Sequence, residues 1–412
     1  MEVVHTHCCG LDIHKKSIAA CIIVPGTKGN SRKEIRTFGT MTNDIVKLSE
    51  WLSACVVTHV AMESTGEYWK PIFNILENNF QLLLVNPQHI KTVPGRKTDV
   101  RDCEWIADLL RHGLLRASFV PDRDQRELRD LTRYRTSLIE ERSAEVNRLQ
   151  KTLEGANIRL SSVASDVMGA SGRQMLAALL EGKADPKEMA ELAKGSMRGK
   201  IPQLEKALEG QFRPHQRFLV AQQLAHIDYL DELIAQLNEE VAKRVRPFEE
   251  VIQRLDGIPG VGRIVAEVIV AEIGLDMSRF PTANHLASWA GMSPGNNESA
   301  GKRKSGRTRK GNSALRQALV QAAHAAGHKR DSHLAAQFRR LAGRRGKKRA
   351  AVAVGHSILV IAYHIIKEGS EYQDLGGNYY DLRDKETIKL RLIRRLEGMG
   401  LKVSVEPAKE AA

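Results

Sequence analysis

The amino-acid sequence predicts an α/β domain followed by an all-α remainder, because the pattern of apolar residues changes along the chain. Over about the first 115 residues, apolar or alternating runs of strand length are interspersed with helical stretches. From about Asp122 onward, the sequence has the pattern of long, charged helices. A length of 412 residues, with 42% hydrophobic and 27% charged residues, is sufficient for several globular domains with their own cores.

The first domain is expected to contain a mixed sheet. Three strands in succession, followed by strands that alternate with helices, favour this arrangement. The strands are expected over His7–Leu11, Ile18–Val24, Glu34–Phe38, Val56–Met62 and Leu82–Val85. The helices are expected over Asn43–Ala54, Glu67–Asn78 and Asp99–His112.

Two apolar repeats predict a helical, coiled-coil arm in the middle of the chain. One repeat steps by three and four residues, as in a heptad seam, and consists of Ile227, Leu230, Ile234, Leu237 and Val241. A rougher one consists of Leu128, Leu131, Leu138, Val146, Leu149 and Leu153. Two such helices can pack antiparallel on each other or pair with another subunit. Between them, Gly and Pro separate shorter helical pieces such as 174–180 and 186–194.

A glycine-rich turn opens the third region. The run from Leu255 to Gly262 joins a helix end to a helix expected over Arg263–Ile273, and this order predicts a helix-hairpin-helix turn. Glycines let backbone N–H groups approach a phosphate, and the next helix N-terminus adds a positive dipole. A plain tight turn between packed helices is the alternative.

After Gly291, the sequence predicts a basic loop, helices over 313–326 and 350–366, and a polar tail. The expected parts are thus residues 1–118, 119–248, 249–368 and 369–412.

Positive charge is concentrated in one segment. Lys and Arg number 63 against 49 Asp and Glu, a formal net charge of +14. Residues 301–350 contain 16 of these basic residues and one acid, Asp331, so this segment carries the whole imbalance. Such runs neutralise nucleic-acid phosphates, which contributes affinity but no sequence choice. A solvated basic surface is the alternative.

Metal-binding cysteines, disulfides and membrane segments are all disfavoured by the sequence. The five cysteines lie in the first quarter of the chain without a Cys-x-x-Cys pair. His5, His7, Cys8 and Cys9 alternate along an expected strand, which argues against a zinc site. No signal peptide is evident, and the most apolar stretch, residues 357–366, is too short to span a bilayer. We therefore expect a cytoplasmic protein.

Four acids of the first domain occupy positions suited to metal binding. Asp12 follows the first expected strand, and Glu63 ends the fourth. Asp99 and Asp102 are three residues apart at a helix start and so share one face. Singly, each acid has a structural explanation. Together, their carboxylates can converge as ligands for Mg²⁺ or Mn²⁺, which can stabilise both oxygens of a phosphoryl transfer.

Six short motifs follow one another along the chain. They are Gly10-Leu11-Asp12, Met62-Glu63-Ser64-Thr65-Gly66, Val85-Asn86-Pro87, Lys97-Thr98-Asp99-Val100-Arg101-Asp102, Gly257-Ile258-Pro259-Gly260-Val261-Gly262 and Ala290-Gly291-Met292-Ser293-Pro294. In this order, from about residue 6 to 367, the sequence resembles the DEDD transposases of the IS110 insertion-sequence family. Members of that family are recombinases guided by a bridge RNA.

The resemblance implies a fold and a set of partners. It implies an amino-terminal domain similar to the RuvC resolvase, with an RNase H fold, in which the four acids match Asp12, Glu63, Asp99 and Asp102. It further implies Mg²⁺, donor and target DNA, a bridge RNA that pairs with both, and dimers that pair into a tetramer on DNA. It also implies a bacterial or archaeal cell, with the protein associated with the nucleoid. This chain differs in its longer middle region and its extra tail beyond about residue 370.

The resemblance also implies a serine nucleophile. The family has a serine just after a glutamate, which here is Ser299 in Asn297-Glu298-Ser299-Ala300-Gly301. By resemblance, Ser299 attacks a DNA phosphate and forms a phosphoserine link, while acid-bound Mg²⁺ stabilises charge. From the residues alone, Ser293, Ser305 and Ser313 are rivals on the same glycine-rich stretch. The residues expected to bind nucleic acid are Gly257, Gly260, Gly262, Lys302, Arg303, Lys304, Arg307, Arg309 and Lys310.

Two other functions fit the same residues. A metal-dependent nuclease or resolvase would use the four acids but let water or a 3′-hydroxyl attack instead of Ser299. A non-catalytic scaffold would use only the glycine-rich turn and the basic segment. If base pairing with a guide RNA selects the target, the side chains of the protein need not encode the target sequence.

Overall fold

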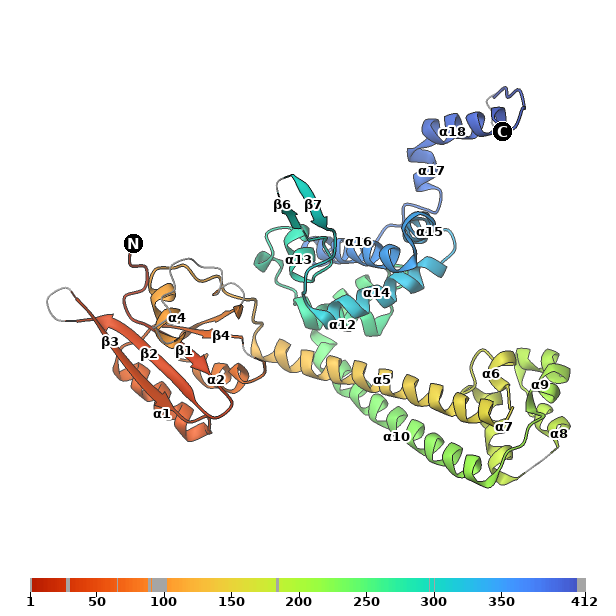
Figure 1. Ribbon diagram of the computed structural model, residues 1–412, viewed down its shortest axis with the longest axis horizontal. Helices are drawn as coiled ribbons and strands as arrows, with labels where there is room; N and C mark the ends of the chain where they lie inside the picture. Colours follow the sequence, from red (N-terminus) through yellow and green to blue (C-terminus); the bar gives the residue numbers. More distant parts are fainter. Residues whose placement is uncertain are drawn as a thin grey trace. The chain divides into compact units, whose positions relative to one another are not determined.

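Figure 1 shows the computed structural model of the chain. It describes residues 2–26, 30–64, 66–87, 90, 102–182, 185–295, 297–299 and 301–405, with residues 297–299 and 302–305 described by their backbone. The chain forms two compact units, residues 1–123 and 124–412. The finer boundaries expected at residues 118, 248 and 368 stay predictions.

The first unit is built on the mixed five-stranded sheet that the sequence predicts. Its strands are β1 (Cys8–Ile13), β2 (Ile18–Pro25), β3 (Ser31–Phe38), β4 (His59–Glu63) and β5 (Gln81–Val85). Their order across the sheet is β3-β2-β1-β4-β5. The first three strands pair antiparallel, whereas β4 and β5 run parallel to β1. The parallel pairs follow from the helices that precede β4 and β5, because a parallel partner requires a crossover connection.

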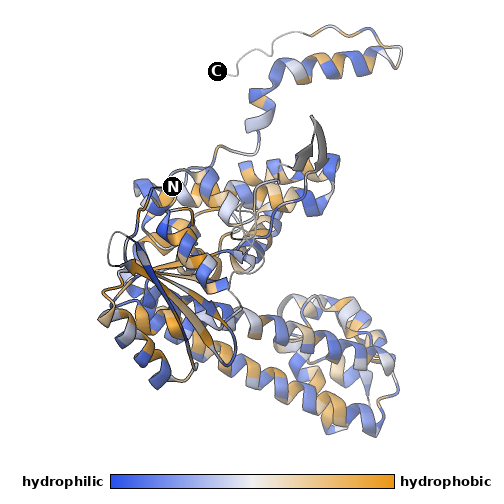
Figure 2. Cartoon of the chain, turned by 60° about the vertical axis from the view of Figure 1, so that its left-hand side comes forward, coloured by the Kyte–Doolittle hydropathy of each residue, from blue (hydrophilic) through white to orange (hydrophobic). Residues whose placement is uncertain are grey.

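Helices cover both faces of this sheet, each over its own apolar cluster. The helices α1 (Thr42–Ala54) and α2 (Trp69–Leu76) belong to one layer, and α4 (Asp102–Arg111) packs against β1, β2 and β4. Residues of β1 alternate between the two sides, so Cys9 and Leu11 join one cluster and Cys8 the other. Figure 2 shows the apolar residues of this unit concentrated on the strands and on the helices beside them. The start of the third expected helix, residues 99–101, lies outside the described residues.

The second unit begins with a long helical arm. The helices α5 (Arg123–Gly155) and α10 (Pro214–Val245) run antiparallel along each other (Figure 1). Arg244 pairs with Glu127 at one end, with 2.8 Å between nitrogen and oxygen, and Arg142 pairs with Asp231 further along. Antiparallel packing is therefore the arrangement within the chain. The buried residues of the two predicted seams are Leu128, Leu138, Leu149, Leu153, Ile227, Leu230 and Val241.

A small helical cluster closes the far end of the arm. It contains α6 (Leu160–Val163), α7 (Ala170–Glu181), α8 (Pro186–Ala190), a 3-10 helix η2 (Gly195–Lys200) and α9 (Ile201–Leu208). Met175 and Leu204, both fully buried, pack in one apolar cluster with Leu149 of α5 and Val220 of α10. The tip therefore has a core of its own, which joins the two arm helices.

The remainder of the second unit is mostly helical. Before the basic segment come η3 (Arg246–Phe248), α11 (Glu249–Asp256), α12 (Arg263–Ile273), η4 (Met277–Arg279) and α13 (Ala283–Trp289). The next elements are β6 (Asn297–Ser299), β7 (Lys302–Ser305), α14 (Ser313–His328), α15 (His333–Arg345), α16 (Lys347–Glu368), α17 (Tyr379–Arg383) and α18 (Lys385–Glu397).

Three expectations for this region need correction. The basic loop after Gly291 contains a β-hairpin, β6–β7. A further helix, α15, occupies part of the basic segment, because Leu334, Ala335 and Phe338 recur at helical spacing and are buried. The polar tail forms α17 and α18, although none of the residues of these two helices is buried. In each case the high charge of the sequence concealed a regular element.

The helix α16 is longer than the sequence predicts, and it is the one described helix long and apolar enough to cross a membrane by length and composition. Nine of its residues are buried, among them Val354, Ile358, Leu359 and Tyr363. It packs against α11, α13, α14 and α15. Its apolar character thus belongs to the core of the helical bundle (Figure 1).

Buried carboxylates join the arm to this bundle. Glu272 of α12 is fully buried and accepts two hydrogen bonds from Arg133 of α5, at 2.6 and 2.9 Å. Arg129, one turn earlier, pairs with the same carboxylate at 3.3 Å. Glu267 of α12 accepts a 2.6 Å hydrogen bond from Arg135, whose side chain is 1% exposed. Because a buried charge left alone is costly, these pairs fix α5 on α12.

We predict that Glu272→Ala destabilises the second unit by about 3 kcal/mol, because Arg129 and Arg133 would lose their shared partner at a buried site. Amide hydrogen exchange in α12 would measure this change. Glu250→Ala is the control, since Glu250 also pairs with an arginine, Arg254, but its side chain is 79% exposed. The control should cost less than about 1 kcal/mol. Equal losses in the two variants would contradict the prediction.

Candidate functional site

Two of the predicted acids lie at the same edge of the sheet. The strands β1 and β4 are in parallel register through the pair Leu11 and Met62, so the next residues, Asp12 and Glu63, are neighbours. β4 and β5 are paired through Glu63 and Val85, and Asn86 follows. The carboxyl ends of three parallel strands therefore meet at this edge, the usual position of ligand-binding residues in open sheets.

The same acids face the side of the sheet that α4 covers. Side chains alternate along a strand, so Asp12 lies on the side of Cys8 and Gly10, and Glu63 on the side of Ala61. Cys8 and Ala61 belong to the apolar cluster that also contains α4. Asp102 is the first residue of α4 and is exposed. The fold thus brings Asp12, Glu63 and the helix that begins with Asp102 to one side of the sheet.

A glycine permits the close approach of this helix. A Cβ atom at Gly10 would overlap the backbone oxygen of Cys103 and the backbone nitrogen of Ala107. Both overlapping atoms belong to the main chain of α4, so no side-chain rotation would relieve them. Gly10 is therefore required for α4 to lie directly on β1, two residues before Asp12.

Asp12 has a partner that sequence reasoning missed. Nε2 of His14 lies 3.2 Å from Oδ2 of Asp12, and the Asp12 side chain is 25% exposed. His14 begins the turn between β1 and β2, where its backbone N–H donates to the carbonyl of Ser17 at 2.9 Å. The signal was the spacing, since residues 12 and 14 point to the same side of an extended chain.

The carboxylates are chemically suitable for a divalent cation, although the described side chains do not complete a site. Carboxylate oxygens are the ligands that Mg²⁺ and Mn²⁺ prefer. Within the described residues, no three His, Cys, Asp or Glu side chains form a group able to hold a metal ion. The fourth predicted acid, Asp99, lies outside these residues. The role of all four acids remains a prediction.

The neighbouring cysteines are unsuited to nucleophilic chemistry. Cys8, Cys9, Cys21 and Cys103 are buried and belong to no disulfide. Burial raises the pKa of the Cys8 thiol to about 12 and that of the Cys9 thiol well above its ordinary value. Because the thiolate is the reactive form, these side chains act as small apolar core residues.

The predicted serine lies on the β6–β7 hairpin of the second unit. Ser299 is the last residue of β6 and pairs with Lys302, and Glu298 pairs with Arg303. Ser305, one of its rivals, pairs with Asn297 at the other end of the hairpin. Gly301 adopts φ +72°, which the turn between the two strands requires. The backbone thus places Ser299 beside the turn and directly opposite a lysine.

The base of this hairpin is fixed by close contact between two chain segments. A Cβ at Gly291 would lie 2.8 Å from the carbonyl oxygen of Arg309, and Gly295 donates to the carbonyl of Arg307 at 2.9 Å. Directly after these segments, Asn312 caps α14 by accepting from the Leu315 N–H at 3.0 Å. The Asn312 amide also donates to buried Glu272 at 2.5 Å. The hairpin is therefore joined to the carboxylate that holds the arm.

The glycines of the glycine-rich turn differ in what surrounds them. Gly260 adopts φ +88°, and a Cβ there would overlap the backbone of Ala322 and Ala326 in α14, so this glycine is needed for helix packing. Gly257 and Gly262 are exposed, and a Cβ at Gly262 would meet nothing within 4 Å. Gly262 is the N-cap residue of α12, and its position brings no capping side chain to the first turn of that helix. Binding of a phosphate by this turn stays a prediction.

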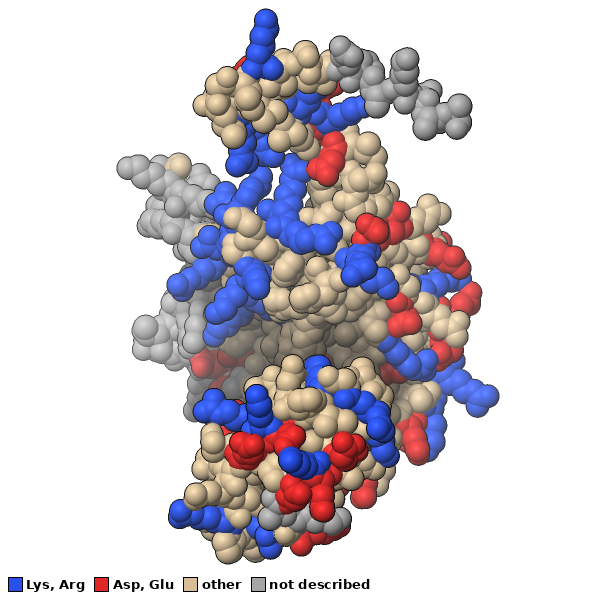
Figure 3. Space-filling model, turned by 90° about the vertical axis from the view of Figure 1, so that its right-hand side faces the viewer, with Lys and Arg blue, Asp and Glu red and all other residues tan. Residues whose placement is uncertain are grey.

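Basic side chains are exposed around the hairpin base. Arg307, Arg309 and Lys310 are all exposed, whereas the side chains of 302–304 are not described. Figure 3 shows Lys and Arg gathered over the C-terminal helices on one face of the molecule. This distribution agrees with a polyanionic partner for the second unit.

Two family models match the chain. The first, described as a transposase model, matches residues 9–158. The second, described as a model of the IS116/IS110/IS902 transposase family, matches residues 252–339. The first match therefore includes the sheet and α5, and the second includes the turn, the hairpin and most of α15.

Curated relatives are similar over most of their length. The transposase for insertion sequence element IS1111A of Coxiella burnetii is 24% identical, over 80% of this chain and 84% of the relative. The transposase for insertion sequence element IS1328 of Yersinia enterocolitica is 25% identical, over 68% of this chain and 73% of the relative. An insertion element IS116 protein of Streptomyces clavuligerus is 29% identical, over 52% of this chain and 60% of the relative.

We predict that Gly10→Ala displaces α4 from β1 and destabilises the first unit by about 1–3 kcal/mol, because the added methyl group would overlap main-chain atoms. Amide hydrogen exchange in α4, together with thermal unfolding, would measure the effect. Gly199→Ala is the control, since a Cβ there meets nothing within 4 Å. If both variants were as stable as the natural protein, the packing argument would be wrong.

Proposed function

Because the chain belongs to the IS110 family of insertion-sequence transposases, we propose that it cuts and rejoins DNA with Ser299 as nucleophile. It is a DNA transposase. The single observation that best supports the proposed cutting and rejoining of DNA is the position of Asp12 and Glu63, which β1 and β4 bring together where these strands end. The amino-terminal sheet order agrees with the proposed RNase H-like domain, similar to RuvC.

The acids would hold a divalent cation in this proposal. Asp12, Glu63, Asp99 and Asp102 would be the ligands, with Mg²⁺ as the preferred ion and Mn²⁺ as a substitute. The bound cation would supply positive charge to a phosphate undergoing transfer. The protein contributes the placement, since Gly10 permits α4 to carry Asp102 close to β1.

Ser299 would form a covalent link with DNA. Its hydroxyl oxygen bonds to phosphorus and releases its proton, while the bond from phosphorus to the leaving DNA oxygen breaks and that oxygen takes up a proton. A DNA hydroxyl then attacks the phosphoserine, which restores the serine and rejoins a strand. The phosphodiester is exchanged without an external energy source, as a recombinase requires. The backbone supports this role because Ser299 lies opposite Lys302 on the hairpin.

The basic segment would hold the DNA, and base pairing would select it. Lys302, Arg303 and Lys304 follow the serine in sequence, and Arg307, Arg309 and Lys310 are exposed nearby. The exposed turn glycines Gly257 and Gly262 would add backbone contacts to a phosphate. Such contacts carry no sequence information, which suits recognition by a bridge RNA that pairs with donor and target DNA.

We predict that Ser299→Ala abolishes recombination of the intact element DNA in cells and eliminates a protein–DNA adduct at this residue, because no other group would form the phosphoserine. Detergent-resistant adducts and peptide mapping would detect the link. Ser305→Ala is a matched control from the same hairpin and should keep both recombination and the adduct. Recombination by Ser299→Ala without any adduct would instead favour the metal-dependent nuclease, in which water or a 3′-hydroxyl attacks.

We also propose that dimers pair into a tetramer, and that different copies supply the serine and the acids at one cut. Asp102→Asn and Ser299→Ala should each be inactive, but mixed assemblies of the two should recover part of the recombination activity. The measurement is recombination after co-expression at several ratios. Full activity of Asp102→Asn alone would favour a non-catalytic scaffold, and absence of recovery in verified mixed assemblies would contradict supply by different copies.

A further inference from the structure

We propose that a pocket between α15 and the two C-terminal helices binds the phosphate backbone of a nucleic acid, at a site separate from Ser299 and the acids. The pocket has a volume of about 550 Å³. Arg339, Arg340 and Arg344 line it from α15, and Arg391 lines it from α18. The second family model matches residues 252–339. Of the residues that line the pocket, Ala336 and Arg339 lie within this match, and the others lie beyond it.

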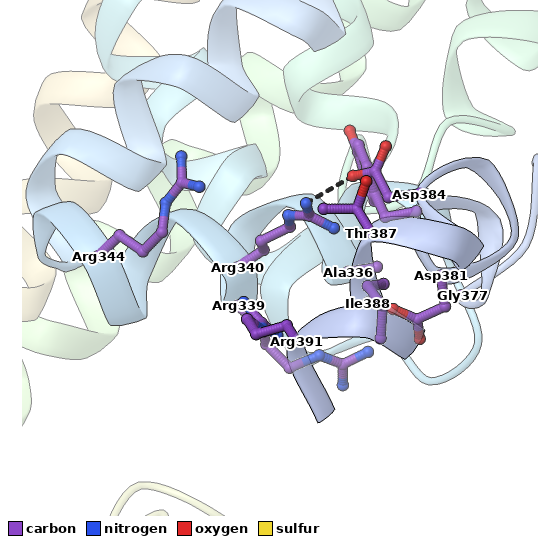
Figure 4. Close-up of a pocket in the computed structure, with 11 residues that line it drawn as sticks. Ala336, Arg339, Arg340, Arg344, Gly377, Asp381, Asp384, Thr387, Ile388 and Arg391 are labelled. Atoms are coloured by element: carbon purple, nitrogen blue, oxygen red, sulfur yellow. Dashed lines mark hydrogen bonds and ion pairs between the residues drawn. The ribbon is translucent and has the colours of Figure 1, made fainter. Parts of the chain in front are cut away.

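One wall of the pocket is held by a compact set of contacts. Arg340 pairs with Asp384 at 2.7 Å, and Arg383 pairs with the same carboxylate at 2.9 Å. Figure 4 shows the Arg340–Asp384 pair within the pocket. The guanidinium groups of both arginines lie over the Tyr380 ring, at 5.3 and 5.0 Å from its centroid. His333 stacks on Tyr380 at 5.1 Å. These contacts join α15 to α17 and α18 without any ligand.

The charge that remains is positive. Asp384 is already shared by two arginines, and the Arg383 guanidinium, with Arg340, keeps the pKa of that carboxyl below its ordinary value. Of the pocket residues, Asp381 is the other acid. Arg339, Arg344 and Arg391 are exposed and form no ion pair with the part of the chain that the structure describes. Three cations thus line the pocket, with one further acid to balance them.

The chemistry of these groups selects a phosphate backbone. Guanidinium groups bind phosphate oxygens through paired N–H donors. The cations belong to two helices, and Figure 4 shows Arg344 apart from Arg339 and Arg391, an arrangement suited to several phosphates along a strand. Tyr380 is covered by His333 and two arginines, so it offers no free face for a base. The site should therefore bind without sequence preference, and its affinity should depend strongly on salt.

The test is the salt dependence of nucleic-acid binding by the full-length protein. Fluorescence anisotropy would measure affinity for a 30-base-pair DNA and for a single-stranded RNA of random sequence over a range of salt concentrations. For at least one of them, Arg339→Gln with Arg391→Gln should lower affinity roughly tenfold or more at 0.1 M salt, and lower the slope of log affinity against log salt by about 1.4–1.8. The two probes identify whether DNA, RNA or both occupy the pocket.

A matched control distinguishes the loss of phosphate contacts in the pocket from the effect of a lower net charge. Arg330 precedes α15 and Arg394 lies on α18; both are exposed, and neither lines the pocket. Arg330→Gln with Arg394→Gln removes the same charge and should leave the slope nearly unchanged. Arg339→Lys with Arg391→Lys should keep most of the slope, because the positive charges remain. Equal losses in the two glutamine pairs, or no loss with either probe, would overturn the proposal.

The result of this binding test does not depend on the proposed serine chemistry. Ser299→Ala should bind both probes with the natural affinity and slope, since that change removes no cation. A failure of the pocket proposal would therefore appear in binding, whereas a failure of the serine proposal would appear in the adduct assay. Because Arg339 and Arg391 are exposed, the glutamine variants should fold, and circular dichroism would verify this.

Discussion

The second unit depends on one buried carboxylate, that of Glu272. It lies on α12, accepts hydrogen bonds from Arg133 of α5, pairs with Arg129 and accepts from Asn312, which caps α14. The arm, the packed helices and the base of the hairpin therefore meet at a single buried charge. A charge in such a place is tolerated only with several partners, so the contacts are mutually required.

The first unit depends instead on the absence of a side chain at one position, Gly10. Gly10 lets the main chain of α4 contact β1, and the register of β1 and β4 places Asp12 beside Glu63. One unit is thus organised by a buried charge and the other by a close backbone approach. Gly10 lies two residues before Asp12, and Glu272 is joined through Asn312 to the segment that follows the hairpin.

Much of this fold could be predicted from the sequence, because its elements have strong periodic patterns. The five strands of the first unit and the helices α1, α2, α12 and α14 lie within a few residues of their expected bounds. The exceptions were α15, α18 and the β6–β7 hairpin, where frequent Lys and Arg obscure the pattern of apolar residues. There the regular structure depends on packing against distant segments, as Phe338 does on Gly327 of α14. His14 was missed for a different reason, because its spacing of two residues from Asp12 was a local signal that the sequence reasoning did not use.

The sequence by itself predicted most of the strands and helices, the candidate acids and the concentration of positive charge. These follow from local spacing and composition, which require no knowledge of distant contacts, whereas Ser299 was predicted only from the resemblance to a family. Only the tertiary structure decided that Gly260 packs against α14, that Arg133 and Arg129 share Glu272, and that Arg391 faces the arginines of α15. Each of these pairs residues far apart in the chain, and the choice among possible partners is made by burial and charge compensation, which act only once the chain is folded.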